Sequence, residues 1–108
     1  MKAEVAAKDL IRFFTQTLIP DIKESDPKSG YILDFQTIVK VLRAQLAGKS
    51  TASINKIIQK AGFEGHDVQS FANWFWDTHI NKNTKVPLWV KGIIVFGNSA
   101  DVILTLRS

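Results

Sequence analysis

The chain has 108 residues, of which 45% are hydrophobic and 22% are charged, and its formal net charge is +4. This length and composition predict one globular domain spanning residues 1–108, because a single core suffices and apolar residues are plentiful. Cysteine is absent, which excludes a disulfide framework and a thiolate metal site. Glu4 and Asp9 argue against a signal peptide, and no apolar run approaches the roughly 20 residues of a membrane span. We therefore expect a cytoplasmic protein that does not enter membranes.

The first predicted helix spans residues 4–18, where apolar side chains recur at three- and four-residue spacings. Pro20 lacks a backbone N–H and disfavours helical geometry at the residue before it. We expect this helix to end near Pro20 or to kink there, with a short helical turn over residues 20–24. Residues 25–30 read SDPKSG and predict a loop.

Residues 34–63 predict two amphipathic helices joined by a short turn. The first covers residues 35–47, with Asp34 as its N-cap and Gly48 in the left-handed position after its last turn. The second begins after Ser50 or Thr51 and ends at residue 62. The face of the first helix opposite its apolar stripe carries Gln36, Lys40, Arg43, Ala44 and Ala47. The outer face of the second helix carries Ala52, Asn55, Lys56, Gln59 and Lys60.

This helical pair also accounts for the net charge. Between Asp34 and Glu64 no residue is acidic and five are basic, namely Lys40, Arg43, Lys49, Lys56 and Lys60. The rest of the chain holds nine basic and ten acidic residues. Such an asymmetry favours an anionic partner, but lysine-rich helical faces are also common as plain solvated surface. Both interpretations stay open.

A further helix is expected over residues 68–80, with Asp67 as its N-cap. Its apolar arc, flanked by Trp74 and Trp76, covers about half of the circumference, so the helix should be covered on two sides. Pro87 is expected to mark the start of structure that is no longer helical.

The C-terminal residues change to a two-residue period. Residues 91–96 are rich in β-branched side chains, residues 97–101 predict a turn, and residues 102–107 alternate. This pattern predicts a β-hairpin docked on the wide apolar arc of the helix over residues 68–80, because an isolated hairpin is marginal in water. The predicted fold class is α+β: a small, mainly helical domain of about four helices with a C-terminal β-hairpin, compatible with a winged-helix arrangement.

The helical pair contains part of a helix-turn-helix pattern. Ala44, Gly48 and Ile54 occur at the spacing of the small residue, the glycine and the buried β-branched residue of that motif. Arg43, however, occupies a position that should face the core, and the apolar periodicity turns Ala44 toward solvent. A strict helix-turn-helix is therefore disfavoured, and a looser three-helix or winged-helix arrangement remains.

In that arrangement the second helix of the pair would enter the major groove of DNA, and residues 97–101 would form the tip of a wing. The only ionised residue of this tip is Asp101, whereas contact with phosphate favours lysine or arginine. The candidate nucleic-acid-binding residues are Lys40, Arg43, Lys49, Thr51, Asn55, Lys56, Gln59 and Lys60.

The alternative is a protein-binding adaptor or small inhibitor with an exposed aromatic surface near residues 68–80, formed by Trp74, Trp76 and Trp89. A homodimer is one form that such a surface would allow. Core packing competes with this interpretation, since a domain of this size needs large side chains in its interior. Trp76, at the edge of the arc, is the tryptophan expected to be exposed.

The sequence contains no pattern for catalysis or for a cofactor. His66 and His79 are the only histidines, and neither has a second histidine or a cysteine at metal-ligand spacing. His79 is expected to pack on the apolar side of its helix or to interact with the helix dipole. Glycine-rich phosphate loops, nucleophile motifs and paired acids are absent. We therefore expect a non-enzymatic binding protein without metal or cofactor.

Overall fold

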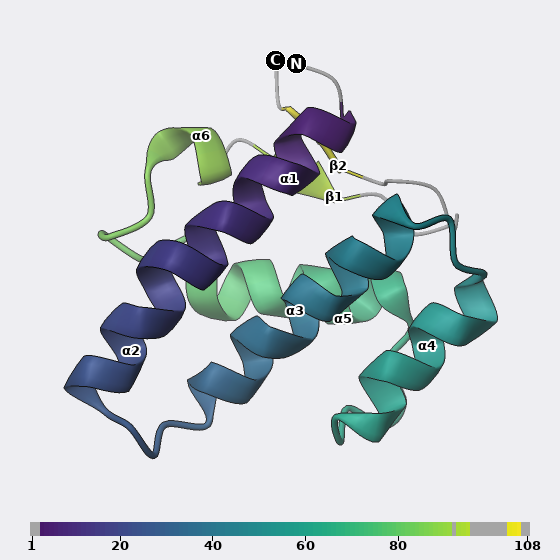
Figure 1. Cartoon of the computed structure of the whole chain (residues 1–108), viewed down its shortest axis with the longest axis horizontal. Coiled ribbons are helices and arrows are strands. Elements are labelled where there is room, and N and C mark those ends of the chain that lie inside the picture. The colour runs from purple at the N-terminus through teal and green to yellow at the C-terminus, as the bar shows by residue number, and fades with distance from the viewer. Residues whose placement is uncertain (1–2, 92, 96–103, 107–108) are drawn as a thin grey trace.

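The structure, a computed structural model, describes residues 3–91, 93–95 and 104–106. Its helices pack around a core to which both halves of the chain contribute (Figure 1). In chain order the helical elements are α1 (Ala3–Phe13), the π-helical turn η1 (Phe14–Leu18), α2 (Ile19–Ser25), α3 (Tyr31–Leu46), α4 (Thr51–Lys60), α5 (Val68–Phe75), the π-helical turn η2 (Trp76–Ile80) and α6 (Leu88–Lys91).

The expected α+β class is wrong, and with it the winged-helix arrangement. The structure is mostly helical, at 73% helix. Among the described residues, the strands are β1 (Ile93–Val95) and β2 (Leu104–Leu106), three residues each, which pair antiparallel. β1 lies beside α5, part of the helix on which docking was expected, and β2 lies beside α1. Residues 97–101, the expected tip of a wing, lie outside the described residues.

α1, η1 and α2 form one continuous helix that passes through Pro20 (Figure 1). The Ile19 N–H donates to the Phe14 carbonyl, five residues earlier, so η1 is wider than an α-helical turn. Pro20 then lies at the start of α2, where its missing N–H is tolerated. The Thr15 hydroxyl donates to the Ile11 carbonyl at 2.7 Å, a contact of the kind that bends helices. The helix therefore does not end at Pro20, because a π turn precedes the proline.

A second proline begins a helix instead of ending helical structure. The Pro87 carbonyl accepts the Val90 N–H at 3.1 Å and the Lys91 N–H at 3.3 Å, which closes the short helix α6. The fixed φ of proline suits the first turn of a helix, where a missing N–H costs nothing. Taking Pro87 as the end of helical structure therefore misses α6.

α3 begins at Tyr31, four residues before the predicted start. Asp34 consequently lies in the first turn and is not an N-cap, and its carboxylate contacts His79 instead. The end of the helix follows the prediction: Gly48 has φ 71°, and its N–H donates to the Gln45 carbonyl at 3.0 Å. Glycine suits this position because a side chain would be strained at positive φ.

Two side-chain caps fix where α4 and α5 begin. The Ser50 hydroxyl accepts the Ser53 N–H at 3.1 Å, so Ser50 is the cap and Thr51 is the first helical residue. Asp67 Oδ1 accepts the Ser70 N–H at 2.8 Å, and the Ser70 hydroxyl accepts the Asp67 N–H at 3.1 Å. The Ser70 N–H holds the pKa of Asp67 below its usual value, because it stabilises the ionised carboxylate. The predicted cap at Asp67 is confirmed.

Three phenylalanine rings from three helices meet at the centre of the core. Phe14 of η1 lies edge-on to Phe35 of α3 and to Phe75 of α5, with ring centroids 5.4 Å and 5.8 Å apart. The Phe35 and Phe75 centroids are 4.9 Å apart. Edge-to-face rings at these distances add specific attraction to the burial of their apolar area. This cluster holds the N-terminal helix, α3 and α5 in fixed relative positions.

Candidate nucleic-acid interface

A groove lies between the N-terminal helix and the outer face of α3. Its volume is about 370 Å³, and it is lined by Thr15, Ile19, Gln36, Val39, Lys40 and Arg43. Ile19 and Val39 are buried and form its apolar floor. Gln36, Lys40 and Arg43 follow one another at spacings of four and three residues, so they share one face of α3 and form one wall. Two predicted nucleic-acid-binding residues are thereby brought together at one cavity.

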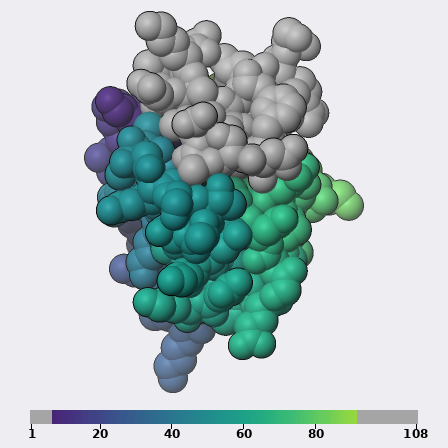
Figure 2. Space-filling view, turned by 90° about the vertical axis from the view of Figure 1, so that its right-hand side faces the viewer, coloured from purple at the N-terminus to yellow at the C-terminus, as the bar shows by residue number. Residues whose placement is uncertain are grey.

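The other predicted basic residues lie on or beside α4. Lys49, Lys56 and Lys60 are exposed, as are the predicted polar residues Thr51 and Gln59. Figure 2 looks onto this helix, which forms an open surface next to α5. None of the five lines the groove beside α3. The basic residues therefore form a groove group on α3 and a separate group on α4.

Asn55 is the one predicted nucleic-acid-binding residue whose side chain is not exposed. It is half-buried, and its Oδ1 is buried without a hydrogen-bond partner among the described atoms. Asn55 lies three residues before the buried Ile58, so it borders the buried face of α4.

The basic residues of α3 and α4 keep their charge free of carboxylate partners within the described part of the chain. The ion pairs found there are Arg12–Asp9, His79–Asp34 and Lys85–Asp21. Asp34 flanks the basic segment in sequence, but its carboxylate is 2.8 Å from His79 Nε2 and the side chain is largely buried. The positive charge of the helical pair is therefore available to an external anion.

The small residue of the helix-turn-helix pattern does not face solvent. Ala44 is 8% exposed, and the expectation that it points outward is wrong. The turn at Gly48 folds α4 back beside α3, and this end of α3 is thereby covered. Ile54 is buried as well, whereas Arg43 is exposed. The three matching residues reflect a tight corner between two helices, which needs a small side chain and a glycine.

His79 forms the buried polar contact that sequence reasoning missed. Its Nε2 lies 2.8 Å from Asp34 Oδ2, across 45 positions of the chain. The rings of Tyr31, Phe35 and Phe75 surround it, with centroids 4.6 Å, 5.1 Å and 5.1 Å from its own. The packing of His79 was expected, but its partner was not. Asp34 stands four residues before the buried Ile38, so the two share one face of the helix. This spacing was the signal in the sequence that Asp34 faces the interior and needs a buried partner.

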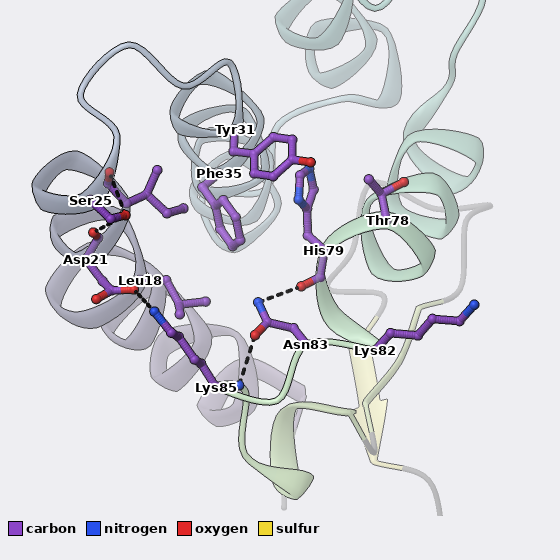
Figure 3. A pocket seen from close by; sticks show the side chains of 11 residues that line it. Leu18, Asp21, Ser25, Tyr31, Phe35, Thr78, His79, Lys82, Asn83 and Lys85 are labelled. Atoms are coloured by element: carbon purple, nitrogen blue, oxygen red, sulfur yellow. Dashed lines mark hydrogen bonds and ion pairs between the residues drawn. The ribbon is translucent and has the colours of Figure 1, made fainter.

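A second cavity, the His79 cleft, lies beside this pair between α2, the start of α3 and the end of η2 (Figure 3). Its volume is about 370 Å³. The Lys85 ammonium pairs with the Asp21 carboxylate at 2.9 Å, and the Asn83 amide donates to the His79 carbonyl at 3.1 Å. Among the described residues, no serine or threonine hydroxyl is within hydrogen-bond distance of the His79 ring.

The three tryptophans do not form one surface. Trp76 is only 6% exposed, and its indole N–H reaches toward the Val90 carbonyl at 3.5 Å, so its predicted exposure is wrong. The reason is that α6, which the sequence did not predict, packs on η2. Trp74 is half-buried against Phe63, with centroids 5.4 Å apart. Trp89 alone is exposed, at 38%.

Comparisons of the chain with protein-family models, with curated proteins and with solved structures found no match. Among the described residues, no helix has both the length and the apolar character needed to cross a bilayer. Within the same ranges, no group of three histidine or acidic side chains is arranged to hold a metal ion.

Proposed function

We propose that the protein is a non-enzymatic nucleic-acid-binding protein that uses the basic surface of α3 and α4. One observation carries this proposal: the five basic residues of this pair are exposed, and none has a described carboxylate partner. Side chains of this kind supply most of the affinity for a phosphate backbone by releasing its condensed counterions. DNA is the first partner to test, and a cytoplasmic location belongs to the same proposal.

The test is fluorescence anisotropy with a labelled oligonucleotide, as a single strand and as its duplex, over a series of salt concentrations. Contacts to four or five phosphates should make log K fall against log salt with a slope of about −3 to −4.5, at roughly −0.7 per contact for single strands and −0.9 for duplex. Absence of binding to both forms at low salt would show that the proposal is wrong.

A matched pair of variants separates a basic surface from net charge. Lys40→Glu with Lys56→Glu reverses one charge on each helix, and Lys23→Glu with Lys28→Glu makes the same change elsewhere. All four side chains are exposed and have no described ion-pair partner, so melting temperatures should stay close to that of the unmodified protein. The first pair should abolish most binding and the second should reduce it only slightly. Equal losses would mean that binding depends on overall charge alone.

A second candidate function is protein binding through α6. Leu88 is 84% exposed and stands next to the exposed Trp89, a combination typical of interaction surfaces. Self-association is the simplest form of this candidate, and sedimentation velocity at rising protein concentration tests it. Leu88→Asp should then restore a monomer, whereas Leu33→Asp, at an exposed leucine of α3, should not. A protein that stays monomeric at every concentration would refute self-association through α6.

A further inference from the structure

The groove between the N-terminal helix and α3 combines two kinds of surface. Its floor is apolar, because Ile19 and Val39 are buried side chains that line it. Its rim carries the polar and charged groups. A volume of about 370 Å³ falls in the range of small-molecule sites, which is roughly 300–1,000 Å³. A bare phosphate would use the rim and leave the floor in contact with water, so the groove suits a ligand with a ring attached to its anionic group.

The cations of the rim are placed for one phosphate group. Lys40 and Arg43 are three residues apart on α3, so their side chains leave adjacent turns on the same side. The guanidinium fork of Arg43 can bind two phosphate oxygens at once, and Lys40 adds a point charge. No acidic side chain is among the residues that line the groove. An anion at this rim therefore meets attraction without a competing carboxylate.

Two neutral polar side chains, Gln36 and Thr15, also line the groove. The Gln36 amide, one turn before Lys40, offers both a donor and an acceptor. The Thr15 hydroxyl already donates to the Ile11 carbonyl at 2.7 Å, so its oxygen is left as an acceptor. A nucleobase edge presents donors and acceptors that match such a set. In a duplex these edges are paired and stacked, and a base can enter a side pocket only when it is unpaired.

We propose that this groove binds one unpaired nucleotide of a single-stranded nucleic acid, with its base against Ile19 and Val39 and its phosphate at Lys40 and Arg43. The inference rests on the proposed nucleic-acid-binding function and adds the strand state and the place of the contact. The lysines of α4 then hold neighbouring phosphates by charge alone. Single strands should bind more tightly than the duplex of the same sequence at equal salt.

The experiment compares changes in the groove with identical changes at exposed positions outside it. Gln36→Glu places a carboxylate at the rim, and its control is Gln69→Glu at an exposed position of α5 that does not line the groove. Lys40→Glu with Arg43→Glu is compared with Lys56→Glu with Lys60→Glu in the same way. All six side chains are exposed, so each variant should keep the melting temperature of the unmodified protein.

Anisotropy with a labelled thymidine oligonucleotide gives the main result. Gln36→Glu should weaken single-strand binding by about tenfold or more, because a hydrogen bond is lost and a charge repels the phosphate, while Gln69→Glu should change it by less than about threefold. In an NMR titration, thymidine monophosphate should shift the signals of Ile19 and Val39, and inorganic phosphate should not.

The possible outcomes separate this inference from the function on which it rests. Equal effects of Gln36→Glu and Gln69→Glu, or tighter binding of the duplex, would overturn the nucleotide groove and leave a nucleic-acid-binding surface. Shifts at Ile19 and Val39 produced equally by inorganic phosphate would reduce the groove to an anion site. No binding of any oligonucleotide at low salt would overturn the inference and the proposed function together.

Discussion

Replacing Trp76 by alanine should destabilise the protein strongly. The indole is 6% exposed and packs between Phe14 and Phe75, at centroid distances of 6.3 Å and 5.6 Å. Removing a buried tryptophan of this kind costs about 3–5 kcal/mol, since it combines lost burial with the cavity left behind. The hydrogen bond to the Val90 carbonyl, at 3.5 Å, is long and adds little. At about 4 °C per kcal/mol, the melting temperature should fall by about 12–20 °C.

The control is Trp89→Ala, which makes the same substitution at a side chain that is 38% exposed. Trp89 keeps an edge contact with Phe13, at a centroid distance of 6.0 Å, so its loss should be smaller, at about 1–2 kcal/mol. Thermal unfolding followed by circular dichroism measures both variants. A fall for Trp76→Ala no larger than that for Trp89→Ala would refute the placement of Trp76 in the core beneath α6.

Two further measurements test local features. A double-mutant cycle with His79→Gln and Asp34→Asn should give a coupling energy between about 0.5 and 3 kcal/mol, and a value near zero would contradict the buried contact. Asp67→Ala should cost about 1 kcal/mol at neutral pH through loss of the cap of α5. The folded-state pKa of Asp67 is lowered, so its charge stabilises the fold above the unfolded-state pKa, and this stabilisation is lost as the pH falls through the folded value. The difference between Asp67→Ala and the unmodified protein, measured by urea unfolding, should therefore shrink below about pH 4.

Local chemistry was readable from the sequence where each feature depends on a few neighbouring residues. The cap at Asp67 and the glycine termination at Gly48 need only the residues of one turn. The apolar stripes of α3 and α4 follow from helical periodicity, and Ile38 and Ile54 are buried as it predicts. The exposure of Lys40 on the opposite face follows from the same periodicity. None of these features depends on contacts with distant parts of the chain.

Features that depend on distant parts of the chain could not be predicted. Asp34 is a good cap residue by type, and only the packing of α3 on η2 makes it the partner of His79. Trp76 lies at the edge of an ideal helical arc, and only α6, folding back from Pro87, covers it. The charge asymmetry indicated α3 and α4 as the candidate binding region. It could not indicate that Lys40 borders a cavity shared with the N-terminal helix, because that cavity depends on how the two helices pack.

The two π turns, which the sequence did not predict, both contribute residues to the cavities. η1 contributes Thr15 to the groove and Leu18 to the His79 cleft, and η2 contributes Thr78 and His79 to that cleft. A π turn holds more residues than an α turn, so the side chains after it are rotated relative to the stripe before it. Arcs drawn at a constant angle per residue therefore misplace side chains that follow a π turn, whereas Trp76 stands at the start of η2 and is covered by α6. Because π turns weaken regular packing, they are often found where a helix forms the wall of a functional site, and here each of them forms part of a cavity wall.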